Sequence, residues 1–316
     1  MTNIETTKVL YIAGCGRSGS TILSRVIGHI SGFFAAGDIH YIWDMSFPEN
    51  HLCGCAKPFR ECEFWNAVIE EAFGGTSRVD VEHIRALRRS IARVRHTPLA
   101  ALPFLRTDAY RHKLDEYSGI LSRLYATMKK ISGSRVIVDS SKSAPDGFIL
   151  GQISDIELYV VHLIRDSRAV AYSYQREKFR PEIYWRTEYT PRHSSIRAVK
   201  DWCVANILGH SLKYVSAKYM PVKYEDVFNQ PRHWVSRIVT SVGEVWPDQE
   251  PFVSDTSVKL KANHTVLGNP NRFDQGLIEI RPDIEWQNKM TRSHRYLVTA
   301  LTWPLLLTYG YFSNSV

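Results

Sequence analysis

The chain has 316 residues, of which 44% are hydrophobic and 23% are charged, a composition that is typical of a globular protein with one large core. No internal repeat, low-complexity tract or long linker divides it, so we expect a single domain over residues 1–316. Its 40 Lys and Arg outnumber its 32 Asp and Glu, and the formal charge of +8 favours an anionic ligand without choosing among nucleotide, nucleic acid, membrane surface and polyanionic substrate.

The two ends of the sequence argue against export and against a membrane span. Residues Met1–Lys8 are polar and include Glu5, so they lack the basic start, apolar run and cleavage site of a secretory signal. The most apolar part of the uncharged C-terminal run, Tyr296–Phe312, contains Pro304 and predicts a buried terminal helix rather than a bilayer crossing. We expect a cytoplasmic protein with no transmembrane segment.

Short apolar runs alternate with segments of helical pattern along the chain. The first run, Val9–Ala13, is followed by helical spacing of apolar residues in Thr21–Ile30. The later runs are Arg135–Asp139, Leu158–Arg165 and Pro221–Tyr224. Near-continuous apolar strands of this kind are buried on both faces, so we predict a three-layer α/β fold with a mainly parallel sheet flanked by helices.

Two long segments between these runs have a helical pattern. Residues 81–130 are rich in Arg, Leu and Ala and predict two or more helices, interrupted near Pro98 and Pro103. We assign residues of about 66–132 to a helical insertion whose arginines form a solvated face. Another helix is predicted within 194–217, where an apolar stripe follows a serine cap.

A glycine-rich loop lies where the first strand meets the first helix. Residues Gly14–Thr21 fit the pattern G-x₄-G-x-S/T, but Ser20 stands where an ATPase or GTPase has the lysine that grips a triphosphate. Inward N–H groups and a helix N-terminus can hold a phosphate without any particular side chain. The loop therefore favours a nucleotide whose single 5′-phosphate carries a transferable group, with Arg17 beside it. The alternative is a glycine turn that only packs a helix on a strand.

A second motif follows the strand that ends at Arg165. If a helix begins near Asp166, Ser173 lies about two turns inside it. Here the sequence resembles the sulfotransferases that use 3′-phosphoadenosine 5′-phosphosulfate (PAPS), whose R-D-P-R-A-V-x-x-S segment holds the 3′-phosphate of the donor. Ser167 replaces the usual proline, a change that affects helix entry more than ligand contact.

The resemblance extends over most of the chain. Val138–Lys142 is similar to the family's second-strand motif, Val222–Asp226 to its Y-E-D strand, and Gly268–Phe273 to the late G-N-P-x-R-F loop of bacterial members. It implies a sulfotransferase fold that is similar to that of P-loop NTPases. The donor residues that it implies are Arg17, Ser18, Gly19, Ser20 and Thr21 at the 5′-phosphosulfate, and Arg165, Ser173 and Arg272 at the 3′-phosphate, with Arg272 in a mobile loop that closes over it.

The implied reaction transfers a sulfuryl group from PAPS to a hydroxyl or amine by in-line displacement. Arg17 and Lys142 are the expected cations for the charge that develops during transfer. Asp38 and His40 compete as the base, because in an extended segment their side chains point the same way. Family members often have a glutamate at the place of Asp38, and His264 is a third candidate. The reaction requires no metal, because the donor carries its own activated group.

Five cysteines, an odd number, do not indicate a disulfide framework in a cytoplasmic chain. Cys53, Cys55 and Cys62 cluster near His51, and these four residues could supply zinc ligands. The C-x-C spacing is less usual than C-x₂-C in a structural zinc site, so plain packing or a local redox bond is the favoured interpretation. The stretch Cys53–Trp65 also recurs in the bacterial branch of the family.

Two other functions compete with sulfuryl transfer. A P-loop kinase requires a lysine at position 20, where this chain has Ser20. A nucleic-acid-binding module would interleave aromatic residues with the basic cluster Arg85–Arg95, and that cluster has none. We therefore expect a small-molecule, carbohydrate or lipid acceptor and no nucleic acid, with a pocket shaped by residues 81–130 and 179–193. The sequence leaves the acceptor's identity and the oligomeric state open.

Overall fold

The centre of the molecule is a five-stranded parallel sheet in the order β2-β3-β1-β4-β5. The computed structural model describes residues 6–312, so most of the polar segment Met1–Lys8 lies outside the described residues. The strands are β1 (Thr7–Gly14), β2 (Phe33–Gly37), β3 (Val136–Lys142), β4 (Ile156–Ile164) and β5 (Lys218–Lys223). The four apolar runs predicted as strands are confirmed, and all their pairings are parallel.

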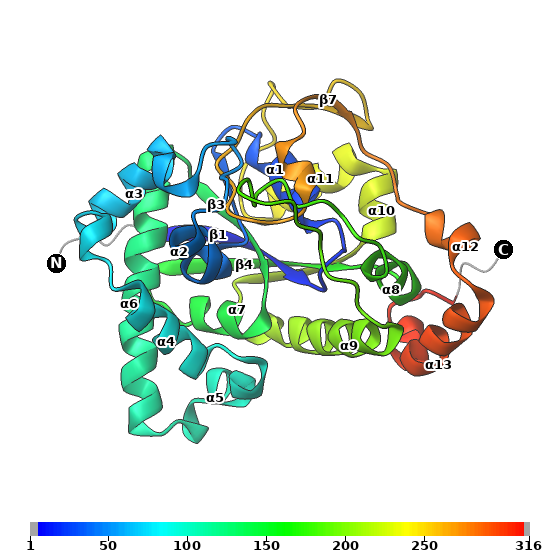
Figure 1. The fold of residues 1–316 in the computed structure, drawn as a ribbon, viewed down its shortest axis with the longest axis horizontal. Helices are drawn as coiled ribbons and strands as arrows, with labels where there is room; N and C mark the ends of the chain where they lie inside the picture. Colours follow the sequence, from blue (N-terminus) through cyan, green and yellow to red (C-terminus); the bar gives the residue numbers. More distant parts are fainter. Residues whose placement is uncertain (1–5, 313–316) are drawn as a thin grey trace.

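Helices cover both faces of the sheet and produce the predicted three layers (Figure 1). The larger helices are α1 (Ser20–Gly28), α3 (Glu63–Phe73), α4 (Val81–Ile91), α6 (Asp108–Ser132), α7 (Ala144–Leu150), α8 (Ser167–Tyr174), α9 (Ser195–Ser211), α11 (Pro231–Ser241) and α13 (Arg292–Thr308). The shorter ones are α2 (Phe47–Glu49), α5 (Thr97–Ala101), α10 (Tyr224–Asn229) and α12 (Glu285–Lys289).

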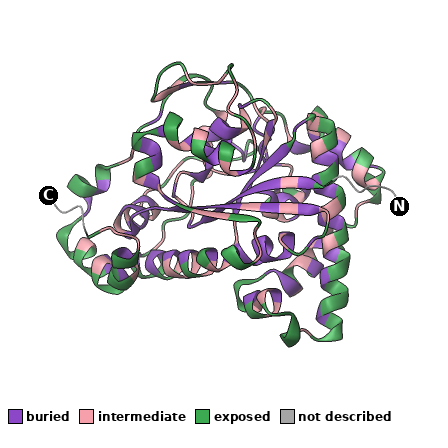
Figure 2. Cartoon of the chain, turned by 180° about the vertical axis from the view of Figure 1, so that it is seen from behind, coloured by how far each residue is buried: buried purple, intermediate pink, exposed green. Residues whose placement is uncertain are grey.

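Alternation along β1 explains why both faces need a covering layer. Val9 and Tyr11 pack in one hydrophobic cluster with α6 and α7, while Leu10 and Ile12 pack in a second cluster with α1 and α11. Successive strand side chains point to opposite faces, so a continuous apolar run supplies both cores. The buried strands form the centre of Figure 2, with exposed residues on the outer helices.

The sequence patterns missed β2 and a small antiparallel ribbon. β2 reads Phe-Phe-Ala-Ala-Gly, in which the two alanines and the glycine oppose the strand preference of the two phenylalanines, and it is an edge strand beside β3. The ribbon pairs β6 (Ser257–Leu260) with β7 (Gly276–Glu279). Between β6 and β7 the chain returns to the sheet edge, where Val266 bridges to Gly37 and its carbonyl accepts a hydrogen bond of 2.7 Å from the Asp38 N–H. This late segment is thereby fixed beside the end of β2.

The segment between β2 and β3 contains α3 to α6, as the helical pattern predicts. Pro98 lies in the first turn of α5, where a missing N–H does no harm, and Pro103 lies in the connection that follows it. The hydroxyl of Thr107 caps α6 by accepting a hydrogen bond from the Tyr110 N–H.

The expectation that the last helix is buried is wrong for most of its surface. α13 buries only Val298, Thr302 and Leu306, while Tyr296 and Trp303 are exposed. It packs along one side against α8 and α9 at the end of the molecule, with no further layer outside it (Figure 1). Among residues 6–312, no helix combines the length and apolar character that a bilayer crossing requires.

Candidate active site

The glycine loop connects β1 to α1 at the carboxyl edge of the sheet. Gly19 has a φ of 83°, and a Cβ at this position would lie 2.6 Å from the ring of Phe228, so only glycine fits. α1 begins at the next residue, Ser20, and no side chain caps it. Its first N–H groups therefore remain available to an anion, which is the usual property of a phosphate loop.

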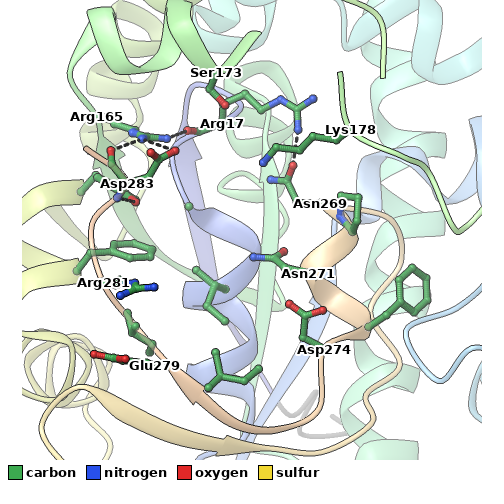
Figure 3. A pocket seen from close by; sticks show the side chains of 18 of the residues that line it. Arg17, Arg165, Ser173, Lys178, Asn269, Asn271, Asp274, Glu279, Arg281 and Asp283 are labelled. Carbon is green, nitrogen blue, oxygen red and sulfur yellow. Dashed lines mark hydrogen bonds and ion pairs between the residues drawn. The ribbon is translucent and has the colours of Figure 1, made fainter. Parts of the chain in front are cut away.

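A cavity of about 810 Å³ opens beside this loop (Figure 3). Its polar lining includes Arg17, Arg165, Ser173, Lys178, Asn269, Asn271, Asp274, Glu279, Arg281 and Asp283. An apolar wall of Ile22, Tyr224, Phe228 and Phe273 completes it. We call it the first cavity. It brings together four of the residues predicted for a bound donor, Arg17, Gly19, Arg165 and Ser173.

Arg165 is held rigidly at the end of β4. Its guanidinium donates to the backbone carbonyls of Arg17 at 2.8 Å and of Asp283 at 2.9 Å, and it lies 4.3 Å from the ring centre of Tyr224. The Trp202 indole donates to the Arg165 carbonyl at 2.8 Å. The Asp283 carboxylate lies 3.4 Å from the guanidinium. Ser173 lies in the last turn of α8 and is buried at the same cavity.

Positive charge exceeds negative charge in the first cavity. Arg17, Arg165, Lys178 and Arg281 face three carboxylates. Burial lowers the pKa of Lys178, and the positive charges of Arg17 and Arg176 lower it further. The part of this pKa shift that comes from the neighbouring cations indicates a place where an anion is favourable. Lys178 and Arg281 were missed at the sequence level, because each is a lone basic residue in irregular chain.

A second cavity of about 390 Å³ lies on the other side of the loop. Its lining includes Gly16, Ser20, Thr21, Asp38, Tyr41, Met45, Lys142, Tyr174, Arg180, Glu182, Thr190, Pro191 and His193. Arg17 and Asn269 line both cavities. The Arg17 guanidinium donates to the Asn269 side-chain oxygen, and the Asn269 N–H donates to the Thr21 hydroxyl at 3.1 Å. These residues form the partition between the cavities.

Asp38 and Lys142 form an ion pair of 2.7 Å at the second cavity. Asp38 directly follows β2 and Lys142 is the last residue of β3. Because these two strands are parallel neighbours, both residues lie at the same edge of the sheet. The Ser140 hydroxyl donates to the same carboxylate oxygen at 2.8 Å, and the lysine ammonium also donates to the Ser140 carbonyl. Lys142 has a φ of 67°, a left-handed conformation that turns its side chain back toward Asp38.

Two of the three candidates for the base do not line either cavity. Residues 39–41 form a 3₁₀ turn rather than extended chain, so the expected alignment of His40 with Asp38 is wrong. The His40 ring packs against that of Tyr41 with ring centres 3.7 Å apart and the planes tilted by 41°, and burial lowers its pKa well below the usual value, with Arg88 and Lys142 adding to the effect. His264 contacts Cys62 instead.

Arg272 also lies away from both cavities. It is fully buried, and its guanidinium donates to the carbonyls of Leu52 at 2.7 Å and of Thr265 at 3.3 Å. The 3₁₀ turn Pro270–Phe273 directs Arg272 inward, so the structure corrects the expectation of a mobile arginine over the 3′-phosphate. The Ser18 hydroxyl is likewise buried and has no hydrogen-bond partner among residues 6–312.

The residues that could hold a metal lie outside both cavities. Cys53, Cys55, Cys62 and His264 gather at one point, whereas His51 contacts Glu49 at 3.0 Å and stacks on Trp185. The neighbouring thiol of Cys53 is the main cause that lowers the pKa of Cys55 to about 6 and that of Cys62 to about 4.

The geometry can be compared with known proteins. A model of the sulfotransferase family matches residues 10–248. No curated protein matches the chain. Among solved structures, the sulfotransferase domain from the Synechococcus PCC 7002 olefin synthase is 17% identical, with a TM-score of 0.48 over 96% of this chain and 97% of that one. The sulfotransferase domain from the curacin biosynthetic pathway is 13% identical, with a TM-score of 0.46 over 94% and 97%.

Sulfotransferase STF9 from Mycobacterium avium is also similar, at 14% identity and a TM-score of 0.42 over 78% of this chain and 66% of that one. The family model spans the glycine loop, the Asp38–Lys142 pair and the segment from Arg165 to Ser173. Since it matches more than two thirds of the sequence, the chain belongs to the sulfotransferase family.

Proposed function

We propose that this protein transfers a sulfuryl group from PAPS to a hydroxyl or amine of a second substrate. The observation that carries the proposal is the pair of cavities that share Arg17 and Asn269 at the glycine loop. A donor in the first cavity would present its phosphosulfate at this partition. An acceptor in the second cavity would then approach the sulfur from the opposite side, as in-line displacement requires.

The first cavity suits a nucleotide with two separate phosphate groups. The loop and Arg17 would bind the 5′-phosphosulfate, while Arg165 and Ser173 would bind the 3′-phosphate, as the resemblance to the family implies. The 3′-phosphate would compete with Asp283 for the Arg165 guanidinium. Tyr224 and Phe228, stacked with ring centres 4.1 Å apart, offer an apolar surface for the adenine ring.

Sulfuryl transfer places negative charge on the bridging oxygen and on the sulfuryl oxygens. The N–H groups at the start of α1, with Arg17 and Lys142, are the donors that would stabilise this charge. A preorganised donor of this kind lowers a barrier by roughly 3–4 kcal/mol. No step requires a metal ion, because the donor already carries the activated group.

Asp38 is the proposed base, since it lines the second cavity and His40 does not. The ammonium of its partner Lys142 would have a second role, at the donor. When Asp38 accepts the acceptor's proton, its negative charge disappears, and the ammonium of Lys142 becomes free to face the charge that develops on the donor. One ion pair would thereby serve both ends of the reaction.

The acceptor would bind in the second cavity, whose size suits a small molecule or one end of a carbohydrate or lipid. Its lining combines Tyr41, Met45 and Tyr174 with the ion pair of Arg180 and Glu182. None of the residues that line the two cavities comes from 66–132, so the helical insertion does not shape them directly. The stretch 179–193 contributes to both, as expected, although Tyr184, Trp185 and Tyr189 are exposed outside them.

Calorimetric titration with 3′-phosphoadenosine 5′-phosphate tests the donor site, with AMP and with ATP plus Mg²⁺ as comparison ligands. We expect the bisphosphate to bind at least about 10-fold more tightly than AMP, because a charge-assisted hydrogen bond contributes about 1.5–3 kcal/mol. Arg165→Ala should abolish that preference. Arg232→Ala, which removes an equal charge from a partly exposed ion pair with Glu250 outside the first cavity, should retain it. Equal or tighter binding of ATP would contradict the proposal and favour a kinase.

A further inference from the structure

Four side chains that could hold a metal converge outside the two cavities. Cys53, Cys55, Cys62 and His264 each offer one ligand atom, and all four atoms lie within 4.8 Å of one another. The Cys62 sulfur is 3.6 Å from that of Cys53 and 3.7 Å from that of Cys55. The Nδ1 atom of His264 is 3.3 Å from the Cys62 sulfur and 3.9 Å from the Cys53 sulfur. We call these residues the Cys₃His cluster.

The four distances of 3.3–3.9 Å are close to the edges of a zinc tetrahedron. With Zn–S bonds of about 2.3 Å and Zn–N bonds of about 2.0–2.1 Å, ideal tetrahedral geometry places two sulfurs about 3.8 Å apart and a sulfur and a nitrogen about 3.6 Å apart. A disulfide would require about 2.05 Å between sulfurs, and all three cysteines are free. The arrangement therefore fits four ligands around one ion better than a local redox bond.

The surroundings hold the ligands in this orientation. Phe64 stacks on His264 with ring centres 5.1 Å apart and an angle of 17°, and the Trp65 indole donates to the His264 carbonyl at 2.9 Å. Cys53 and Cys62 are buried. Contacts that fix the orientation of a liganding imidazole are a regular property of metal sites.

A tight turn brings Cys53 and Cys55 to the same point. The Ala56 N–H donates to the Cys53 carbonyl at 2.8 Å, and Ala56 has a left-handed φ of 63°. Gly54 sits against the late segment, since its N–H donates to the Thr265 carbonyl at 3.1 Å and a Cβ would lie 2.1 Å from the side-chain oxygen of Asn263. The turn and the late segment are thus already in contact beside the cluster.

From this geometry we infer that Cys53, Cys55, Cys62 and His264 bind one Zn²⁺ as a structural ion. Four protein ligands fill the tetrahedron and leave no open position for a substrate, which distinguishes a structural site from a catalytic one. Cys62 and His264 are 202 residues apart in sequence, so the ion joins the loop after β2 to the chain between β6 and β7.

The ion would fasten the segment that forms the partition. Val266, two residues after His264, is hydrogen-bonded to the end of β2 next to Asp38, and Asn269 contacts Arg17 and Thr21. Loss of the ion would therefore loosen both the Asp38 side of the second cavity and the shared wall. The zinc site itself does not depend on the proposed function, since metal content is measured without substrates.

Metal analysis of the full chain tests this inference. Protein purified from zinc-supplemented medium should contain about one zinc per chain, and a strong chelator should remove it and lower the melting temperature. Cys62→Ser and His264→Ala should each reduce the zinc content at least about 10-fold. Cys203→Ser is the matched control, because Cys203 is a half-buried thiol on α9 outside the cluster, and it should retain the full content.

A second measurement keeps the inference testable if the variants fail to fold. Wild-type protein reconstituted with Co²⁺ should show the intense visible bands of a tetrahedral ion and thiolate-to-cobalt charge transfer. Three results would each overturn the site. They are a zinc content below about 0.1 per chain in the wild type, a chain mass that is lower by the two hydrogens lost when one disulfide forms, and the weak visible spectrum of octahedral cobalt. These measurements contain no nucleotide, so they test the zinc site separately from the proposed sulfuryl transfer.

Discussion

Asp38 and Lys142 form an ion pair, and we propose a different role in the reaction for each of them. The parallel register of β2 and β3 places them at one edge, and the Ser140 hydroxyl and carbonyl hold them 2.7 Å apart. Neither is exposed, so each partner offsets the burial of the other. Their different proposed roles, a base and a cation, should separate when each is substituted alone.

Lys142→Ala should lower turnover by about 10²–10³ while changing the affinity for the donor product much less, because it removes a donor to charge that is present only in the transition state. Single-turnover kinetics and calorimetry measure the two effects separately. Lys218→Ala, on the exposed surface of β5, is the control. A large loss of donor affinity with unchanged turnover per bound donor would refute the role given to Lys142.

Asp38→Asn should lower turnover by about 10²–10⁴ and leave binding of the bisphosphate intact, since the amide cannot accept the proton. His40→Asn provides the comparison, because His40 lines neither cavity and should retain turnover within a few-fold. If His40→Asn is the more damaging change, Asp38 is not the base.

At the scale of elements, the sheet contains a buried histidine that links three of them. His162 on β4 lies between Asn206 of α9, at 3.0 Å, and the Tyr219 hydroxyl of β5, at 2.6 Å. Burial lowers its pKa to about 4. The packed elements therefore keep this imidazole neutral well below the pH at which an exposed histidine takes up a proton.

This pKa shift predicts acid sensitivity. Between pH 6.5 and about 4 the unfolded chain binds one more proton than the folded chain at His162, so the stability present above pH 6.5 is lost as the pH falls, by about 3 kcal/mol in total. His162→Gln should remove this loss, so the unfolding free energy of the variant relative to that of wild type, measured with urea, should rise by about 3 kcal/mol as the pH falls from 6.5 to about 4. Burial raises the pKa of Asp139 to about 6, so this group increases the unfolding free energy as the pH falls. It does so equally in wild type and in His162→Gln. Parallel curves for variant and wild type would contradict the assignment.

At the scale of the molecule, the first cavity is assembled from distant parts of the chain. The glycine loop, the end of α8 with residues 178–181, and residues 269–283 all contribute to its lining, and Arg165 is bonded to both Arg17 and Asp283. A ligand that bridges these segments binds only the folded state. Binding should therefore stabilise the whole fold.

The bisphosphate at 100 times its dissociation constant should stabilise the protein by about 2.7 kcal/mol and raise its melting temperature by roughly 5 °C. Lys178→Ala should reduce the shift obtained at the same ligand concentration, because it removes one of the cations of the first cavity. Lys213→Ala, outside that lining, should keep the full shift. An unchanged shift in Lys178→Ala would place Lys178 outside the binding site.

Local patterns determined the fold class and the main landmarks of the site. The strand, glycine loop and helix around Gly14–Thr21, and the strand and helix around Arg165 and Ser173, are continuous in sequence, so hydrophobic periodicity and motif spacing predict them. The same holds for the parallel sheet, because strands buried on both faces are apolar throughout. Periodicity does not predict β2, since Phe33–Gly37 is short and rich in Ala and Gly.

Only the tertiary structure decided which side chains meet. A 3₁₀ turn directs Arg272 inward, another separates His40 from Asp38, and no pattern in the sequence predicts these side-chain directions. The contact of Asn269 with Arg17 and the approach of His264 to Cys62 join residues more than 200 positions apart. Such contacts depend on how the chain after β6 returns to the sheet edge, and long-range packing rather than local preference sets that path.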